Sequence, residues 1–160
     1  MYLAKTLKRE DKETAVVLKF LDAQSKRDLD LMCDLVTDDI VYINEPHPPC
    51  RTIKGRDMFR DVFACSPCIW CSEANLEVLF YSRSKDHTVF TERLDQFLVN
   101  GKWLAIPICG YFKLRNGKIH LWKDYWDYSK YRTFVDKTYG PGFSLFRKNI
   151  FEQENLVSND

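Results

Sequence analysis

The fold is decided by residues 87–127, which read HTVFTERLDQFLV-NG-KWLAIPICGYFKLR-NG-KIHLWKDYWD. Polar and apolar residues alternate along three segments, as they do in strands that bury one face. These segments are 87–99, 102–115 and 118–127. The Asn-Gly pairs between them favour two-residue type I′ turns, in which both positions take positive φ. Because another alternating segment, Leu76–Ser84, comes before them, the sequence predicts four strands, the last three forming an antiparallel meander.

The segments outside the meander indicate helices and one more strand. Apolar residues recur at helical spacing from Glu10 to Asp28 and again after Asp28, a plausible N-cap, as far as Val36. The remaining predicted elements are a strand at Asp39–Asn44 and helices at Lys54–Phe63 and Tyr128–Lys137. This order predicts an α+β fold: a cone-like, curved mixed sheet wrapped around the N-terminal helices, with an internal apolar pocket.

Size and charge limit the kinds of partner. A chain of 160 residues predicts a single domain over 1–160, with 143–160 as a C-terminal tail. Because 24 Lys and Arg balance 23 Asp and Glu, neither nucleic acid nor an anionic membrane is a favoured partner. We find no secretory signal and no apolar run long enough for a membrane span, so we expect a cytoplasmic protein with reduced thiols.

Several charged residues fall on faces that the alternation assigns to the interior. Arg93 and Asp95 share a face of segment 87–99 with Thr91, and this pair alone is typical of a solvated ladder. Asp124, however, lies between Trp122 and Trp126 on one face of the last strand, where a solvated stripe is a poor interpretation. We therefore expect the three charges to meet inside the cone, together with Tyr42 and Asn44 from the first strand. The expected apolar walls are Phe97, Ile106, Ile108, Trp122 and Trp126.

Two carboxyl groups beside one guanidinium favour general acid and base catalysis. Arg93 can hold both side chains through its planar fork, and repulsion between two acids in one apolar site raises one pKa. One acid then stays protonated while the other acts as a base. A water held by Asp124, Tyr42 and Asn44, opposite an acid at Asp95, suits the opening of a strained cyclic ether.

At this point the residues resemble a known family, the limonene-1,2-epoxide hydrolases, over about Lys12–Val135. Four segments carry the resemblance: Tyr42–Pro46, Thr91–Asp95, Gly110–Phe112 and Gly117–Asp127. The resemblance implies the cone fold shared with nuclear transport factor two, scytalone dehydratase and ketosteroid isomerase. It also implies single-step hydrolysis of an epoxide to a vicinal diol without a covalent intermediate, metal or organic cofactor, and a homodimeric protein.

The same resemblance implies a role for each polar residue. Asp124 would be the general base and would activate a water also held by Tyr42 and Asn44. Asp95 would protonate the epoxide oxygen, and Arg93 would bridge the two acids so that the proton can return. Trp122 would form a wall beside the base.

Two positions depart from the family pattern in ways that bear on the substrate, which we expect to be a small lipophilic epoxide. Trp126 replaces a smaller aromatic residue, and Tyr131 stands where the family is usually apolar, which adds a possible hydrogen bond to the ligand. A cofactor-independent isomerase, cyclase or dehydratase, or a non-catalytic protein that binds an apolar ligand, remains open as an alternative on the same fold.

A cysteine cluster and one histidine are further candidates for a site. The spacing of Cys65, Cys68 and Cys71 is compatible with a metal, but no fourth ligand is evident beyond Cys50 or His47. We therefore favour ordinary reduced thiols, and we predict no metal site. For His47 a loop position without a role is favoured over a contact with substrate.

Overall fold

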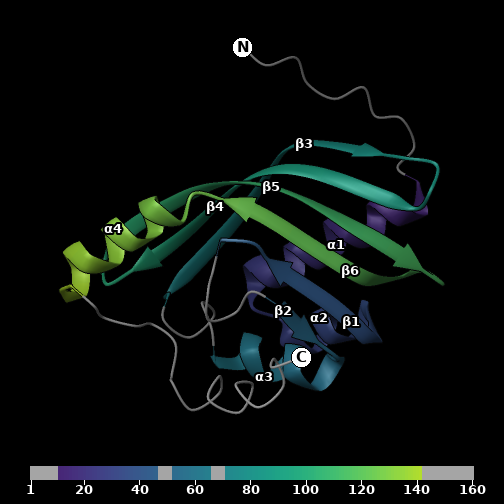
Figure 1. Ribbon diagram of the computed structural model, residues 1–160, viewed down its shortest axis with the longest axis horizontal. Helices are drawn as coiled ribbons and strands as arrows, with labels where there is room; N and C mark the ends of the chain where they lie inside the picture. The colour runs from purple at the N-terminus through teal and green to yellow at the C-terminus, as the bar shows by residue number, and fades with distance from the viewer. Residues whose placement is uncertain (1–10, 47–51, 66–70, 142–160) are drawn as a thin grey trace, which may run out of the picture.

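The computed structural model describes residues 11–46, 52–65 and 71–141 (Figure 1). The helices are α1 (Lys12–Lys26), α2 (Leu29–Asp34), α3 (Arg56–Cys65) and α4 (Tyr128–Tyr139). The strands are β1 (Val36–Asn44), β2 (Thr52–Lys54), β3 (Glu73–Arg83), β4 (Thr88–Val99), β5 (Lys102–Arg115) and β6 (Lys118–Trp126). The predicted tail 143–160, Cys50, Cys68 and His47 lie outside the described residues, as does the side chain of Cys65.

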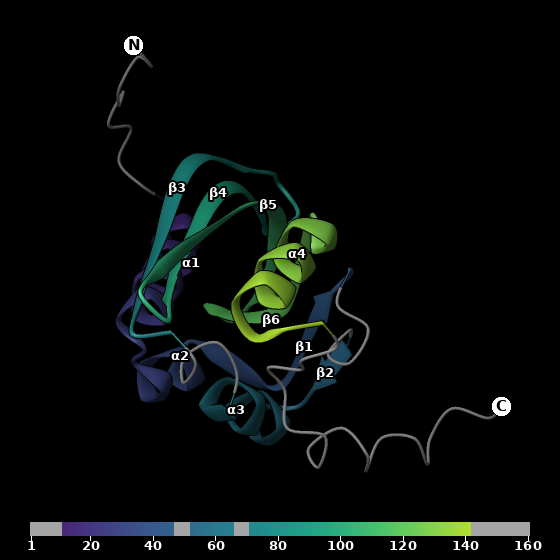
Figure 2. The same ribbon diagram turned by 90° about the vertical axis from the view of Figure 1, so that its left-hand side faces the viewer.

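The six strands form one open, curved sheet in the order β2-β1-β6-β5-β4-β3. β1 runs parallel to β6, and every other neighbouring pair is antiparallel. In Figure 2 the sheet curls from β3 round to β1 and β2, and α4 crosses in front of β5 and β6. This arrangement confirms the predicted α+β fold, in which a curved mixed sheet packs against the N-terminal helices.

The two Asn-Gly turns and the N-cap of α2 form where the sequence predicts them. Asn100 and Gly101 have φ of 50° and 72°, and Asn116 and Gly117 have φ of 52° and 75°, as type I′ turns require. Asp28 caps α2, because its side chain accepts a hydrogen bond from the amide of Leu31. The meander therefore follows directly from local turn chemistry.

Two element boundaries differ from the prediction. The helix expected to continue through Val36 ends at Asp34, and Val36 instead begins β1, where it pairs with Ile119 of β6. Thr52–Lys54 forms the short strand β2 along the edge of β1, so the following helix begins at Arg56 rather than Lys54. Both differences arise from pairing with another strand, which the local periodicity of a segment does not report.

The interior contains two separate groups of buried apolar residues. The larger group joins α1, α2 and α3 to the inner face of the sheet, with Phe20, Phe59, Phe112 and Trp122 at its centre. The smaller group lies under α4 and joins Tyr131 and Val135 to three residues of β5, namely Leu104, Ile106 and Ile108. None of the described helices is both long and apolar enough to cross a membrane.

Candidate active site

Arg93, in the middle of β4, uses all five of its N–H groups within the protein. It donates to both oxygens of Asp95, from Nε to Oδ1 at 3.2 Å and from Nη2 to Oδ2 at 3.3 Å. It also donates to both oxygens of Asp124, from Nη1 to Oδ1 at 3.2 Å and from Nη2 to Oδ2 at 2.9 Å. The remaining Nη1 hydrogen goes to Oγ1 of Thr91 at 3.1 Å. The guanidinium is therefore held by three side chains, with no donor left over.

These three charges lie inside the protein. The side chain of Arg93 is 0% exposed, and those of Asp95 and Asp124 are each 3% exposed. A solvated ladder on the sheet surface, the alternative for Arg93 and Asp95, is thereby excluded. Because taking each charge out of water is costly, an apolar core would serve stability at least as well, and this burial points to a functional site.

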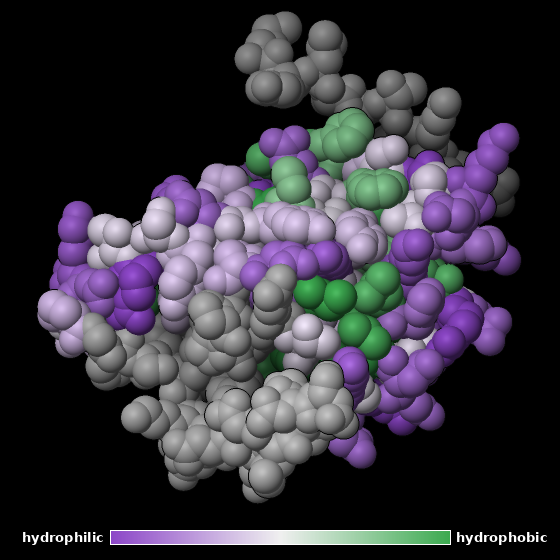
Figure 3. All heavy atoms as spheres, in the orientation of Figure 1, coloured by the Kyte–Doolittle hydropathy of each residue, from purple (hydrophilic) through white to green (hydrophobic). Residues whose placement is uncertain are grey.

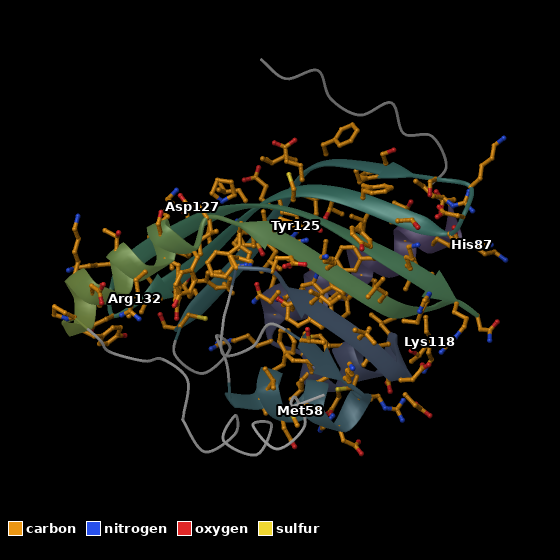
Figure 4. All side chains as sticks on the ribbon, viewed as in Figure 1. Met58, His87, Lys118, Tyr125, Asp127 and Arg132 are labelled. Atoms are coloured by element: carbon orange, nitrogen blue, oxygen red, sulfur yellow. The ribbon has the colours of Figure 1, made fainter. Side chains whose placement is uncertain are left out.

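Sheet register brings the charges together from different parts of the chain. Arg93 and Asp95 share the inner face of β4, as their separation by two residues predicts. Asp124 lies two strands away on β6, and β5 lies between the two strands. In the parallel pairing of β1 with β6, Asn44 lies beside Asp124 and Tyr42 beside Trp122. Tyr125, which follows Asp124 in the chain, marks this part of β6 in Figure 4.

Burial and the neighbouring charges shift the pKa values of Asp95 and Arg93. Desolvation raises the pKa of Asp95, while the attraction of Arg93 opposes that shift and the nearby Asp124 adds to it. Burial is thus a larger cause of the raised pKa of Asp95 than the repulsion between the two acids expected from the sequence. For Arg93, burial works against the charged form, yet the two carboxylates raise its pKa above the ordinary value. The site thus favours a neutral Asp95 beside a charged Arg93.

The two polar residues of β1 each contact an indole. Trp126 donates from Nε1 to Oδ1 of Asn44 at 2.6 Å, so Asn44 keeps its two amide N–H groups for another partner. The ring of Tyr42 stacks on Trp122 with centroids 4.0 Å apart. These contacts fix the planes of both residues next to Asp124.

The predicted apolar walls divide between the two buried groups. Ile106, Ile108, Trp126 and Tyr131 meet under α4, where Trp126 and Tyr131 pack edge to face with centroids 5.6 Å apart. Trp122 belongs to the other group, on the side of α1 and α3. Phe97 is half-buried on the inner face of β4. The charges thus lie on a face whose two ends are apolar.

Two further residues, which the sequence pattern does not predict as site residues, contact the charged groups: Thr91 and Gly110. Thr91 supplies the hydroxyl that completes the contacts of Arg93, and it is itself 4% exposed. Its place two residues before Arg93, on the same predicted face, was the available signal. Gly110 of β5 pairs with Thr91 on one side and with Asp124 on the other. The segment Gly110–Phe112 carries part of the family resemblance, but the alternation along the strand gives this glycine no role in the site.

The described residues contain no group of three or more side chains suited to hold a metal ion. Cys71 is buried, and desolvation raises the pKa of its thiol. The absence of a metal at Cys65, Cys68 and Cys71 stays a prediction from the sequence, because Cys68 and the side chain of Cys65 lie outside the described residues.

Comparison with known proteins places the chain in a family. Residues 11–135 match the limonene-1,2-epoxide hydrolase catalytic domain, and this match includes Tyr42, Asn44 and the three charged residues. The chain belongs to the limonene-1,2-epoxide hydrolase family. The predicted resemblance is thereby confirmed at the level of the family.

Solved structures share the fold of this limonene-1,2-epoxide hydrolase family member. An LEH-like epoxide hydrolase from M. tuberculosis is 23% identical, with a TM-score of 0.65, and the match covers 79% of this chain and 95% of that one. A putative SnoaL-like polyketide cyclase from Shewanella putrefaciens is 16% identical, with a TM-score of 0.68 and coverage of 81% and 99%. A putative polyketide cyclase from Xanthomonas campestris is 17% identical, with a TM-score of 0.64 and coverage of 75% and 93%. At these identities the likeness extends to the fold alone.

Proposed function

We propose that this protein is an epoxide hydrolase that adds water to a small lipophilic epoxide and gives a vicinal diol in one step. The observation that carries the proposal is the buried guanidinium of Arg93, paired through two hydrogen bonds with each of two carboxyl groups. Membership of the limonene-1,2-epoxide hydrolase family supports it.

In the proposed reaction Asp124 is the general base and Asp95 the general acid. Asp124 takes a proton from a water held also by Tyr42 and Asn44, while the oxygen of that water forms a bond to an epoxide carbon. The carbon–oxygen bond of the ring breaks, and Asp95 gives its proton to the departing oxygen. Burial favours the protonated form of Asp95 that this step needs.

The two carboxyl groups must then exchange a proton to begin the next turnover. After the reaction Asp124 carries the extra proton and Asp95 lacks one. Arg93 contacts all four carboxyl oxygens, so it stabilises whichever acid is ionised. We propose that this bridge lets the proton return to Asp95, and no step requires a metal or an organic cofactor.

The apolar side chains are proposed to bind the hydrocarbon part of the substrate. Trp126 and Tyr131 lie together with Ile106 and Ile108 at one end of the charged face. We assign Phe97 and Trp122 to the same task from β4 and β6. These walls exclude water other than the reacting molecule and strengthen the electrostatic contacts inside.

The experiment that tests this function compares the wild type with Asp124→Asn on a panel of limonene, styrene and fatty-acid epoxides. Diols are detected by mass, because hydrolysis adds one water to the substrate. We expect diol from the wild type and none from Asp124→Asn. A product of unchanged mass would identify an isomerase or a cyclase, and tight ligand binding without turnover would indicate a binding protein. Either result would refute the hydrolase.

We also propose that the protein is a homodimer formed by the outer face of the sheet. Large apolar side chains are exposed there, and Figure 3 shows hydrophobic residues at the surface around β3 and β4. The exposed side chains on this face include Phe80, Phe90, Trp103 and Tyr125. Phe80, Phe90, Tyr111 and Tyr125 line a groove of about 380 Å³ on that face. Monomeric proteins rarely expose so many large apolar groups together, and the family resemblance favours a second copy of the chain.

A cytoplasmic location stays a prediction from the sequence.

A further inference from the structure

Gly110 occupies the point of β5 that lies directly between the site residues of β4 and β6. It pairs with Thr91 of β4 and with Asp124 of β6. Its backbone does not adopt the left-handed conformation that Gly101 and Gly117 need for their turns. Conformational freedom therefore does not explain a glycine here, and a glycine inside a strand often marks a close approach by another group.

The approaching group is the carboxyl of Asp124. A Cβ atom added at Gly110 would overlap Oδ1 of Asp124 and would lie 3.2 Å from its Cγ. The added Cβ atom would also lie 2.8 Å from the main-chain oxygen of Lys123. The carboxyl therefore occupies the volume in which any other residue would place its side chain.

The position of Arg93 explains why the carboxyl lies there. Arg93 and Asp124 belong to strands separated by β5, and neighbouring strands are about 4.8 Å apart, so their backbones are about 10 Å apart. Their side chains nevertheless meet at 2.9 Å and 3.2 Å. To span this distance, Asp124 must extend its short side chain across β5 close to the backbone.

We propose that Gly110 is a positioning residue of the active site, because its missing side chain leaves the space in which the carboxyl of Asp124 crosses β5 and reaches Arg93. Gly110 itself touches no reacting atom. The catalytic part of this inference rests on the proposed function, while the structural part concerns only the fit between Gly110 and Asp124. The two parts can be measured separately.

The structural test is a double-mutant cycle with Gly110→Ala and Asp124→Ala, in which urea unfolding measures the stability of the wild type and of each variant. Alanine is better suited than glycine to an ordinary strand position, so a loss of stability indicates a collision. We expect Gly110→Ala to lower the unfolding midpoint clearly in the wild type. In Asp124→Ala the loss should be smaller, leaving mainly the contact with the oxygen of Lys123. Equal losses in both backgrounds would overturn the inference.

The catalytic test is the kinetics of Gly110→Ala on the best epoxide. A misplaced base reduces kcat by about 10²-fold, while KM changes little because the apolar walls are untouched. Lys102→Ala, at an exposed position of the same strand away from the site, is the control and should change neither the kinetics nor the unfolding midpoint. A wild type that makes no diol but shows coupling in the cycle would refute the hydrolase and keep the inference. An active wild type without coupling would refute the inference alone.

Discussion

Replacing Arg93 with Met tests whether the guanidinium is what allows two acids to be buried together. The substitution removes five hydrogen-bond donors and leaves Asp95 and Asp124, each 3% exposed at the side chain, without their cation. Removing one partner of a buried ionic group costs about 3–5 kcal/mol. With a urea dependence of about 2 kcal/mol per molar, the unfolding midpoint should fall by roughly 2 M.

The pH dependence of this loss gives the sharper readout. At pH 7 the variant must bury charge without a partner or hold a proton that the unfolded chain would release. Lowering the pH toward 4 favours the protonated carboxyl groups in the folded and in the unfolded variant alike. The stability that the variant loses relative to the wild type should therefore become smaller. The assay is urea unfolding followed by tryptophan fluorescence at several pH values. A loss that stays constant or grows toward acid pH would show that the unpaired carboxyl groups do not cause it.

Two further variants keep this test informative if Arg93→Met folds poorly. Arg93→Met combined with Asp95→Asn and Asp124→Asn removes all three charges, and it should recover most of the stability lost at pH 7. Arg115→Met removes an ion pair with Asp39 at the surface, where the side chains are 50% and 65% exposed. This control should unfold close to the wild type at pH 7, because water replaces an exposed partner easily.

Three other outcomes follow from the same structure. Because burial raises the pKa of Asp95, the folded protein keeps a proton on this carboxyl that the unfolded chain loses above about pH 4. The wild type should therefore lose stability relative to Asp95→Asn as the pH rises, as measured by urea unfolding. Thr91→Val leaves one N–H of Arg93 unpaired, and we expect a loss of about 1–3 kcal/mol in the same assay, whereas no loss would contradict the contact. Phe90→Lys should shift the homodimer toward monomer in sedimentation, while Lys85→Glu should not, and an unchanged mass for Phe90→Lys would exclude this face.

The fold and the charged residues could be predicted because they depend on local patterns. Asn100-Gly101 fixes a turn through its own φ angles, and alternation along β4 places Arg93 and Asp95 on one face. Trp122 and Trp126 share a face of the last strand with Asp124, and these two indoles indicate that the charged face points to the interior. These signals need only neighbouring residues, and their consequences agree with the structure.

The parts that could not be predicted depend on strands that meet only after folding. β2 exists because Ile53 pairs with Tyr42, and no local signal in Thr52–Lys54 reports that pairing. The bulge in β6 is of the same kind: Ile119 and Trp122 are both buried although strict alternation would separate them. The space above Gly110 likewise depends on a side chain from another strand.

The most direct test of the account is a single turnover in water enriched in ¹⁸O, with enzyme in excess over the best epoxide of the panel. If a water activated by Asp124 attacks carbon directly, the first diol formed carries ¹⁸O, and the enzyme carries none. A first diol with only ¹⁶O would show that a carboxyl oxygen of the protein attacked instead, through a covalent ester. That result, or a product without added water, would contradict the one-step hydrolysis proposed for Asp124, Asp95 and Arg93.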